Sequence, residues 1–146
     1  MKAVIQRVKE ASVEIEGRQT ARIGAGLLVL LGITHADREE QAIALGDKIS
    51  KLRIFEDAAG KMNLSVLDVR GEVLVVSQFT LYADCERGRR PGFEEAAPPE
   101  QAERLYELFA RYLETAGLSV RRGVFGGRMR VALVNDGPVT IILEKN

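Results

Sequence analysis

The sequence predicts one α+β domain covering residues 1–146, with a mainly antiparallel, barrel-like sheet that carries two main helices on one side. Three observations support this fold class. Strand-like segments dominate both ends of the chain, only two segments show the apolar spacing of a helix, and no stretch rich in proline, glycine or serine divides the chain. With 146 residues, 46% of them hydrophobic, the chain is long enough to enclose one core.

The first third of the sequence reads as a run of strands. Residues 2–8 and 11–16 have strand-like composition, a turn is indicated at 17–18, and residues 19–23 form the next strand. Residues 27–33 are almost continuously apolar, which is typical of a strand buried on both faces. We therefore expect a meander of neighbouring strands before the first helix.

The first helix is expected over residues 37–52. Asp37 is suited to cap it, with Glu40 three residues later. Four apolar residues at helical spacing predict its core-facing side: Ala42, Leu45, Ile49 and Leu52.

The middle of the chain contains the clearest strand. A turn at 57–61 and irregular structure at 64–70 precede this strand, which is expected over residues 72–81. The loop at 82–98 is long and charged, and loops of such length in compact domains are usually functional or mobile.

The second helix is expected to start at residues 98–99 and to end near Gly117. Its apolar residues form a core-facing stripe: Leu105, Leu108, Phe109, Tyr112 and Leu113. Strands at 118–125 and 128–134 follow, and a turn at 135–140 leads into the final strand.

Composition excludes several functions. The 21 basic and 21 acidic residues give no net charge, which argues against nucleic-acid binding by bulk charge but leaves a local basic patch open. The lone cysteine, Cys85, cannot form an intrachain disulfide and is typical of a reducing compartment. With one cysteine and one histidine, His35, the usual zinc ligand sets cannot be assembled, so we expect no metal site, and no cofactor is indicated.

The sequence also indicates where the protein resides. Its first residues read as a strand and not as a signal peptide, and the apolar run at 25–31 is far shorter than the ~20 residues of a membrane span. We therefore expect a soluble, cytoplasmic protein that does not contact a membrane. His35 follows a strand and precedes a helix, so we interpret it as a surface loop residue and not as a catalytic base.

The segment Asn135-Asp136-Gly137-Pro138-Val139-Thr140 is the most informative part of the chain. Its proline removes a backbone donor and fixes φ, so the segment cannot simply continue a ladder. If the bond before the proline is cis, which costs only about 0.5–1 kcal/mol for X-Pro, the glycine lets main-chain carbonyls point outward as a rigid acceptor site. An ordinary hairpin turn is the alternative.

A second candidate site follows the apolar part of the 72–81 strand, at Ser77-Gln78-Phe79-Thr80. If the strand continues, Ser77 and Phe79 point one way and Gln78 and Thr80 the other. Hydroxyls, an amide and exposed N–H groups can bind a polar ligand or stabilise an oxyanion, although a polar strand end is the alternative. The only histidine is distant in sequence, so a Ser-His-Asp triad is not indicated.

Two clusters of basic residues can track an RNA backbone. A solvated surface is the alternative, since nearby acidic residues partly offset the first cluster. The clusters are Arg87, Arg89 and Arg90 in the long loop, and Arg121, Arg122, Arg128 and Arg130 near the C-terminus.

Together, the segments 77–81 and 135–140 resemble the two signature motifs of the D-aminoacyl-tRNA deacylases. The resemblance extends along the whole chain, including residues 5–8, 60–64 and 89–91 and the surroundings of Phe125 and Met129. It implies a homodimer that hydrolyses the ester between a D-amino acid and the 3′-terminal adenosine of tRNA.

The resemblance also implies roles for individual residues. A cis Gly137–Pro138 motif from one subunit enters the active site of the other, binds the substrate's α-amino group and excludes L-amino acids. Arg7 holds this motif, and Asn135, Val139 and Thr140 complete it. The catalytic pocket is lined by Ser77, Gln78, Phe79 and Thr80, with the Phe79 amide as oxyanion donor, while Phe125 and Met129 pack near the adenosine.

The catalytic group is left open between two alternatives. Either Thr80 is the nucleophile, or the ribose 2′-hydroxyl of the RNA assists, which the absence of a partnered base favours. Steric exclusion of the L side chain predicts weak discrimination against glycine, so glycyl-tRNA is expected as a second substrate. The competing functions are a non-catalytic nucleic-acid-binding module and a hydrolase of small D-amino esters.

Overall fold

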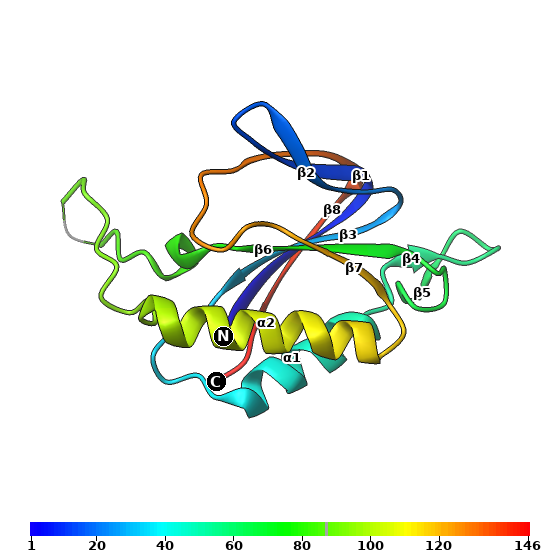
Figure 1. Ribbon diagram of the computed structural model, residues 1–146. Coiled ribbons are helices and arrows are strands. Elements are labelled where there is room, and N and C mark those ends of the chain that lie inside the picture. The colour runs from blue at the N-terminus through cyan, green and yellow to red at the C-terminus, as the bar shows by residue number, and fades with distance from the viewer. Residues whose placement is uncertain (87) are drawn as a thin grey trace.

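The computed structural model describes residues 1–86 and 88–146 (Figure 1). Arg87, one of the arginines assigned to the basic loop, lies outside the described residues. The elements are, in chain order, β1 (Lys2–Ile15), β2 (Arg18–Ile23), β3 (Gly26–Gly32), α1 (Glu39–Ser50), β4 (Phe55–Glu56), β5 (Met62–Leu64), β6 (Glu72–Ser77), the 3-10 turn η1 (Phe79–Tyr82), α2 (Pro99–Thr115), β7 (Ser119–Arg122) and β8 (Arg130–Glu144).

The main sheet has the order β2-β1-β3-β6-β7, and β8 pairs with the other edge of β1. All three partners of β1 run antiparallel to it, whereas β3–β6 and β6–β7 are parallel pairs. Because β1 is long, one of its edges pairs with β3 through residues 2–8 and with β2 through residues 11–15. The predicted α+β class with a mainly antiparallel, barrel-like sheet is confirmed.

Both faces of the central strands β3 and β6 are buried. Helices α1 and α2 pack side by side over one face (Figure 1), where Val73 and Val75 of β6 contact the helix core. Leu74 and Val76 point to the opposite face, into a second apolar cluster with Ile23 of β2. Strand β2 contacts β6 and β7 as well as β1, so the sheet curls back over this face into a nearly closed barrel.

The first helix begins later than predicted, and Asp37 does not cap it. Arg38 occupies the N-cap position, and its N–H donates to Oε1 of Gln41 at 2.9 Å. The carboxylate of Asp37 instead accepts hydrogen bonds from the Thr34 N–H at 2.8 Å and from the ammonium group of Met1 at 2.5 Å. A contact 36 residues away in sequence therefore outcompetes the local cap.

Several strand boundaries also differ from the sequence prediction. The two strands predicted at 2–8 and 11–16 are one strand, Lys2–Ile15, and the small β4–β5 sheet is not apparent from the sequence. Strand β7 ends at Arg122, and β8 begins at Arg130. Within the described part of the chain, no helix is long and apolar enough to cross a membrane.

Candidate functional site

One end of β6 opens into a cavity of about 810 Å³. Its walls come from the end of β6 and η1, from the segment 93–99, from the start of α2 and from the segment 125–131. Five of the residues predicted from sequence line it: Ser77, Gln78, Phe79, Phe125 and Met129. Residues that are 46 or more positions apart in sequence thus meet at one site.

The polar wall forms because β6 ends at Ser77. The Gln78 N–H still bonds to the Leu31 carbonyl at 2.8 Å, and the chain then turns into η1. The prediction of a strand through residue 81 is therefore wrong, and the expected alternation of side chains does not apply. Phe79 and Thr80 are exposed, Nε2 of Gln78 donates to Oγ1 of Thr80, and Thr80 does not line the cavity.

The backbone of η1 carries free donors. Its hydrogen bonds run from Leu81 N–H to the Gln78 carbonyl at 3.2 Å and from Ala83 N–H to the Thr80 carbonyl at 3.1 Å. The N–H groups of Phe79 and Thr80 donate to no described residue, as expected for the first residues of a helical turn. Such N–H groups beside a polar pocket can stabilise an oxyanion.

The apolar wall is close-packed. The ring of Phe125 packs against Tyr106 with 5.9 Å between centroids, and the Tyr106 hydroxyl donates to the buried Val75 carbonyl at 2.8 Å. Burial raises the pKa of Tyr106, so its hydroxyl remains a neutral donor. A Cβ on Gly123 would lie 2.8 Å from Sδ of Met129, so the glycine lets Met129 pack closely.

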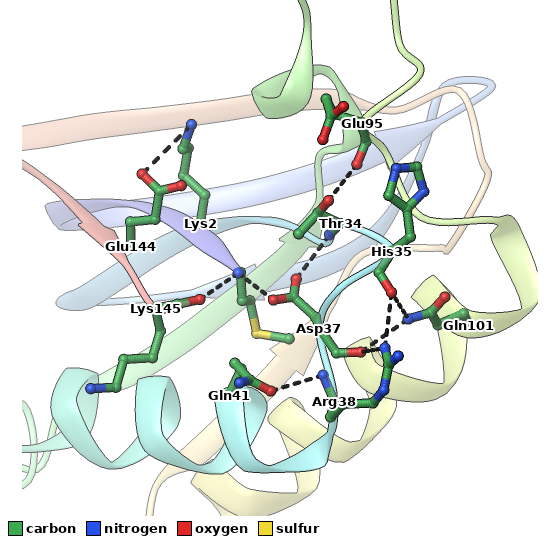
Figure 2. A network of polar contacts seen from close by, with 11 residues as sticks. Lys2, Thr34, His35, Asp37, Arg38, Gln41, Glu95, Gln101, Glu144 and Lys145 are labelled. Carbon is green, nitrogen blue, oxygen red and sulfur yellow. Dashed lines mark hydrogen bonds and ion pairs between the residues drawn. The ribbon is translucent and has the colours of Figure 1, made fainter.

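Sequence reasoning missed the loop that places His35 at the cavity. His35 is an exposed loop residue, as the sequence predicts, and it also lines the cavity. Figure 2 shows the contacts that hold this loop: Thr34 Oγ1 donates to the Glu95 carbonyl at 2.6 Å, and Gln101 Nε2 donates to the carbonyls of His35 at 3.2 Å and Asp37 at 3.0 Å. No local signal in the sequence reveals these contacts.

The segment 135–140 is not a turn between strands. It belongs to β8, which stays paired with β1 on both sides of it, at Val8↔Asn135 and Gln6↔Thr140. Residues 136–139 are thus extra residues opposite the single residue Arg7, and we refer to them as the 136–139 bulge. The Gly137–Pro138 bond is cis, and both residues are exposed.

Side chains fix this bulge from both of its ends. Arg7 is 6% exposed, and its guanidinium donates to the Asp136 carbonyl at 2.9 Å and to the Ile54 carbonyl at 2.6 Å. Oδ1 of Asn135 accepts the Val139 N–H at 2.8 Å, and its Nδ2 lies 3.2 Å from Oγ1 of Thr140. Gly137 has φ +145°, a backbone conformation that favours glycine.

The cavity and the bulge lie at different ends of the sheet within one chain. Arg7 pairs with Leu27, Leu27 pairs with Val73, and Ser77 lies four residues farther along β6. Four residues span roughly 13 Å of strand. Arg7 and residues 135–140 do not line the cavity. The structure therefore gathers the predicted site residues into two groups and does not bring the groups together.

Among the described residues there is no cluster of three or more side chains suited to hold a metal ion. The site offers the Ser77 hydroxyl, the Gln78 amide and main-chain N–H groups on one side, and apolar surface on the other. This combination suits a polar carbonyl centre attached to a flat apolar group.

Comparisons with known proteins agree along the whole chain. The family model for D-Tyr-tRNA(Tyr) deacylase matches residues 4–144. The D-aminoacyl-tRNA deacylases of Thermosipho africanus and Bacillus cereus (strain AH187) are each 56% identical over 144 residues, covering 99% of this chain and 97% and 99% of those proteins.

Solved structures show the same fold. The c-Myc DNA Unwinding Element Binding Protein superposes with a TM-score of 0.94 at 45% identity, covering 100% of this chain and 99% of that one. A probable eukaryotic D-amino acid tRNA deacylase has a TM-score of 0.85 at 16% identity over 97% of each chain, which is a likeness of fold alone.

The fold, the pocket at the end of β6 and the full-length matches together define a hydrolase that acts on aminoacyl-tRNA. The chain belongs to the D-Tyr-tRNA(Tyr) deacylase family, whose curated relatives carry the name D-aminoacyl-tRNA deacylase.

Proposed function

We propose that this chain acts in the cytoplasm as a homodimer that releases D-amino acids from tRNA at two shared sites. Each site combines the cavity of one subunit with the 136–139 bulge of the other. The observation that carries this proposal is the separation of the two groups of site residues by roughly 13 Å along the sheet within one chain. In a dimer, a second copy of the chain can place its 136–139 bulge at the cavity of the first.

The outer edge of β8 supports a paired assembly. Among the described strands, β8 pairs only with β1, so its other edge carries unpaired backbone groups. Val134 is 50% exposed and Ile142 is 66% exposed on this strand. An isologous interface along or beside β8 covers these groups and presents each bulge to the partner subunit.

In the proposed site, the scissile ester lies beside Ser77 and Gln78. The free N–H of Phe79 donates to the oxyanion that forms on the ester carbonyl. The adenosine packs on Phe125 and Met129, and the ribose 2′-hydroxyl assists the attacking water. Thr80 is not the nucleophile in this proposal, because its hydroxyl accepts from Gln78 and does not line the cavity.

Chiral selection rests on main chain and not on a side-chain pocket. The carbonyls of Gly137 and Pro138 bind the substrate's α-amino group, and the L side chain is directed into this backbone. The D side chain points outward, so the protein serves many D-amino acids. Glycine has no side chain to exclude, and glycyl-tRNA is therefore a second substrate at high enzyme concentration. Inertness toward glycyl-tRNA under those conditions argues against purely steric exclusion.

Subunit mixing tests the shared site. Gly137→Ala disables the bulge, since a Cβ there would lie 2.9 Å from the Val139 nitrogen and 2.7 Å from its Cγ2. Ala96→Trp places a large ring at the cavity wall. Each homodimer is first shown to be folded, dimeric and inactive on D-tyrosyl-tRNA.

Random reassociation of the two variants makes half of the dimers mixed, and each mixed dimer has one complete site. We therefore expect about one quarter of wild-type activity after mixing. If the mixture shows no more activity than the two parents, each site is built within one subunit and the shared site is wrong.

A further inference from the structure

We propose that the acceptor stem of the tRNA approaches the cavity across the side formed by β7 and the segment 123–129, and that Arg121 and Arg128 bind its phosphates. This inference rests on the proposed function, because it assigns the path of the same substrate. Of the two basic clusters, the structure separates the four arginines of the C-terminal one by their acidic partners.

Two of the C-terminal arginines already have acidic partners. Arg122 bonds to Glu114 at 2.9 Å and lies 3.5 Å from Glu107, both on α2. Arg130 pairs with Glu14 at 3.6 Å. In contrast, Arg121 and Arg128 are exposed, and neither forms an ion pair with any described residue. Phosphate binding by these two does not require an existing pair to be broken.

Strand register places Arg121 on the face of the sheet opposite the helices. Arg121 pairs with Leu74 and Arg122 with Val75, so their side chains lie on opposite faces of the sheet. Arg122 follows Val75 toward the helices, where its two glutamate partners lie. Arg121 shares the face of Leu74, whose apolar cluster includes Val76 and Met129 of the cavity wall.

Arg128 lies beside the cavity but does not line it. Its two neighbours in sequence, Gly127 and Met129, both line the cavity wall. The segment is held by a turn in which the Gly127 N–H donates to the Val124 carbonyl at 3.0 Å. This turn therefore holds the backbone that carries the exposed Arg128 side chain beside the expected adenosine site.

The opposite rim carries acidic side chains. The segment that leads into α2 and the first turns of α2 carry exposed carboxylates around the wall residues 96–99. None of them forms an ion pair with a described residue. They are Glu94, Glu95, Glu100 and Glu103. Acidic side chains thus flank the wall residues 96–99, whereas Arg121 and Arg128 lie on the other side, so a polyanion whose 3′ end enters the cavity is directed to the β7 side.

The experiment measures deacylation of D-tyrosyl-tRNA by the full-length dimer of R121Q, R128Q and the double variant. We expect roughly a fivefold rise in KM for each single variant, the upper end for one exposed charge contact, with kcat unchanged. The dependence of log(kcat/KM) on log[salt] becomes shallower by about 0.7–0.9 per lost contact.

R111Q is the matched control, because Arg111 is also exposed and forms no ion pair with a described residue, but lies on α2. We expect its KM and salt dependence to equal those of the wild type. E103Q removes a charge from the negative rim, and its KM is expected to stay equal or fall.

A second substrate separates this inference from the proposed function. The KM increase of R121Q and R128Q is confined to tRNA and is absent with 3′-O-(D-tyrosyl)adenosine, which has no stem. Equal losses on both substrates, or an equal loss in R111Q, overturn the assigned path while the wild-type enzyme remains a deacylase. If the wild type hydrolyses neither substrate, the proposed function itself fails.

Discussion

The buried guanidinium of Arg7 provides a direct test of how the 136–139 bulge is held. The substitution Arg7→Met keeps a long apolar stem but removes both donors. It leaves the carbonyls of Asp136 and Ile54 without the bonds of 2.9 and 2.6 Å that Arg7 supplies. Through these bonds Arg7 holds both the bulge and the segment before β4. Their loss leaves neither segment attached to Arg7.

The magnitude follows from the number of bonds. Each hydrogen bond from a charged donor contributes about 1.5–3 kcal/mol, and the variant no longer buries a charge, which offsets part of the loss. We expect the free energy of unfolding to fall by about 3 kcal/mol. For a chain of this length that corresponds to a decrease in Tm of roughly 6–12 °C.

Thermal and urea unfolding at one fixed protein concentration measure the effect, since the stability of the proposed homodimer depends on concentration. Lys9→Met is the matched control: Lys9 also pairs with Asp136, at 3.3 Å, but its side chain is 67% exposed. We expect a change of at most about 0.5 kcal/mol there. An Arg7→Met protein as stable as the Lys9→Met protein refutes the anchoring role.

Three further outcomes are expected. Thr80→Ala retains substantial turnover of D-tyrosyl-tRNA, and complete loss in a folded protein restores Thr80 as the nucleophile. Tyr106→Phe lowers the free energy of unfolding by about 1 kcal/mol in urea titrations, because one neutral bond to the Val75 carbonyl is lost; no change indicates that this bond contributes nothing. Hydrogen bonds from the Ser65 N–H and hydroxyl lower the pKa of Asp68 in the folded protein below its ordinary 3.8. The ionised Asp68 therefore stabilises the fold above pH 3.8, and this contribution is lost as the pH falls through the pKa of the folded protein. Asp68→Asn is expected to flatten this acid limb, and an unchanged limb contradicts the assignment.

The sequence predicted the elements whose signals are local. The helical spacing of apolar residues located both helices, and the continuous apolar run at 27–33 became the central strand β3, buried on both faces. These patterns arise because the apolar side chains face the core. They therefore locate an element even where its exact first and last residues are not predicted.

Errors occurred where distant contacts decide the local structure. Asp37 has the side chain of a cap but binds Met1 and Thr34. The segment 135–140 has turn composition, but β1 pairs with both of its ends and makes it a bulge. Neither the contacts of Asp37 nor the bulge at 136–139 can be predicted from the residues next to them in sequence.

In the candidate site, too, residues with a local sequence signal were predicted and residues placed by distant contacts were not. The polar residues after β6 were identified from a change of composition, whereas His35 reaches the cavity only through contacts with Glu95 and Gln101. Spacing along the chain also gave no indication that Arg7 and Ser77 lie at different ends of the sheet, which is a consequence of strand register.

The most direct test of the central claim is the release of amino acid from matched D- and L-tyrosyl-tRNA by the purified protein. Rapid loss of the D ester, with the L ester intact, is the result that chiral deacylation predicts. Hydrolysis of both esters at equal rates contradicts main-chain exclusion of the L side chain. Inertness toward both, with tRNA still bound, contradicts catalysis and leaves a nucleic-acid-binding module.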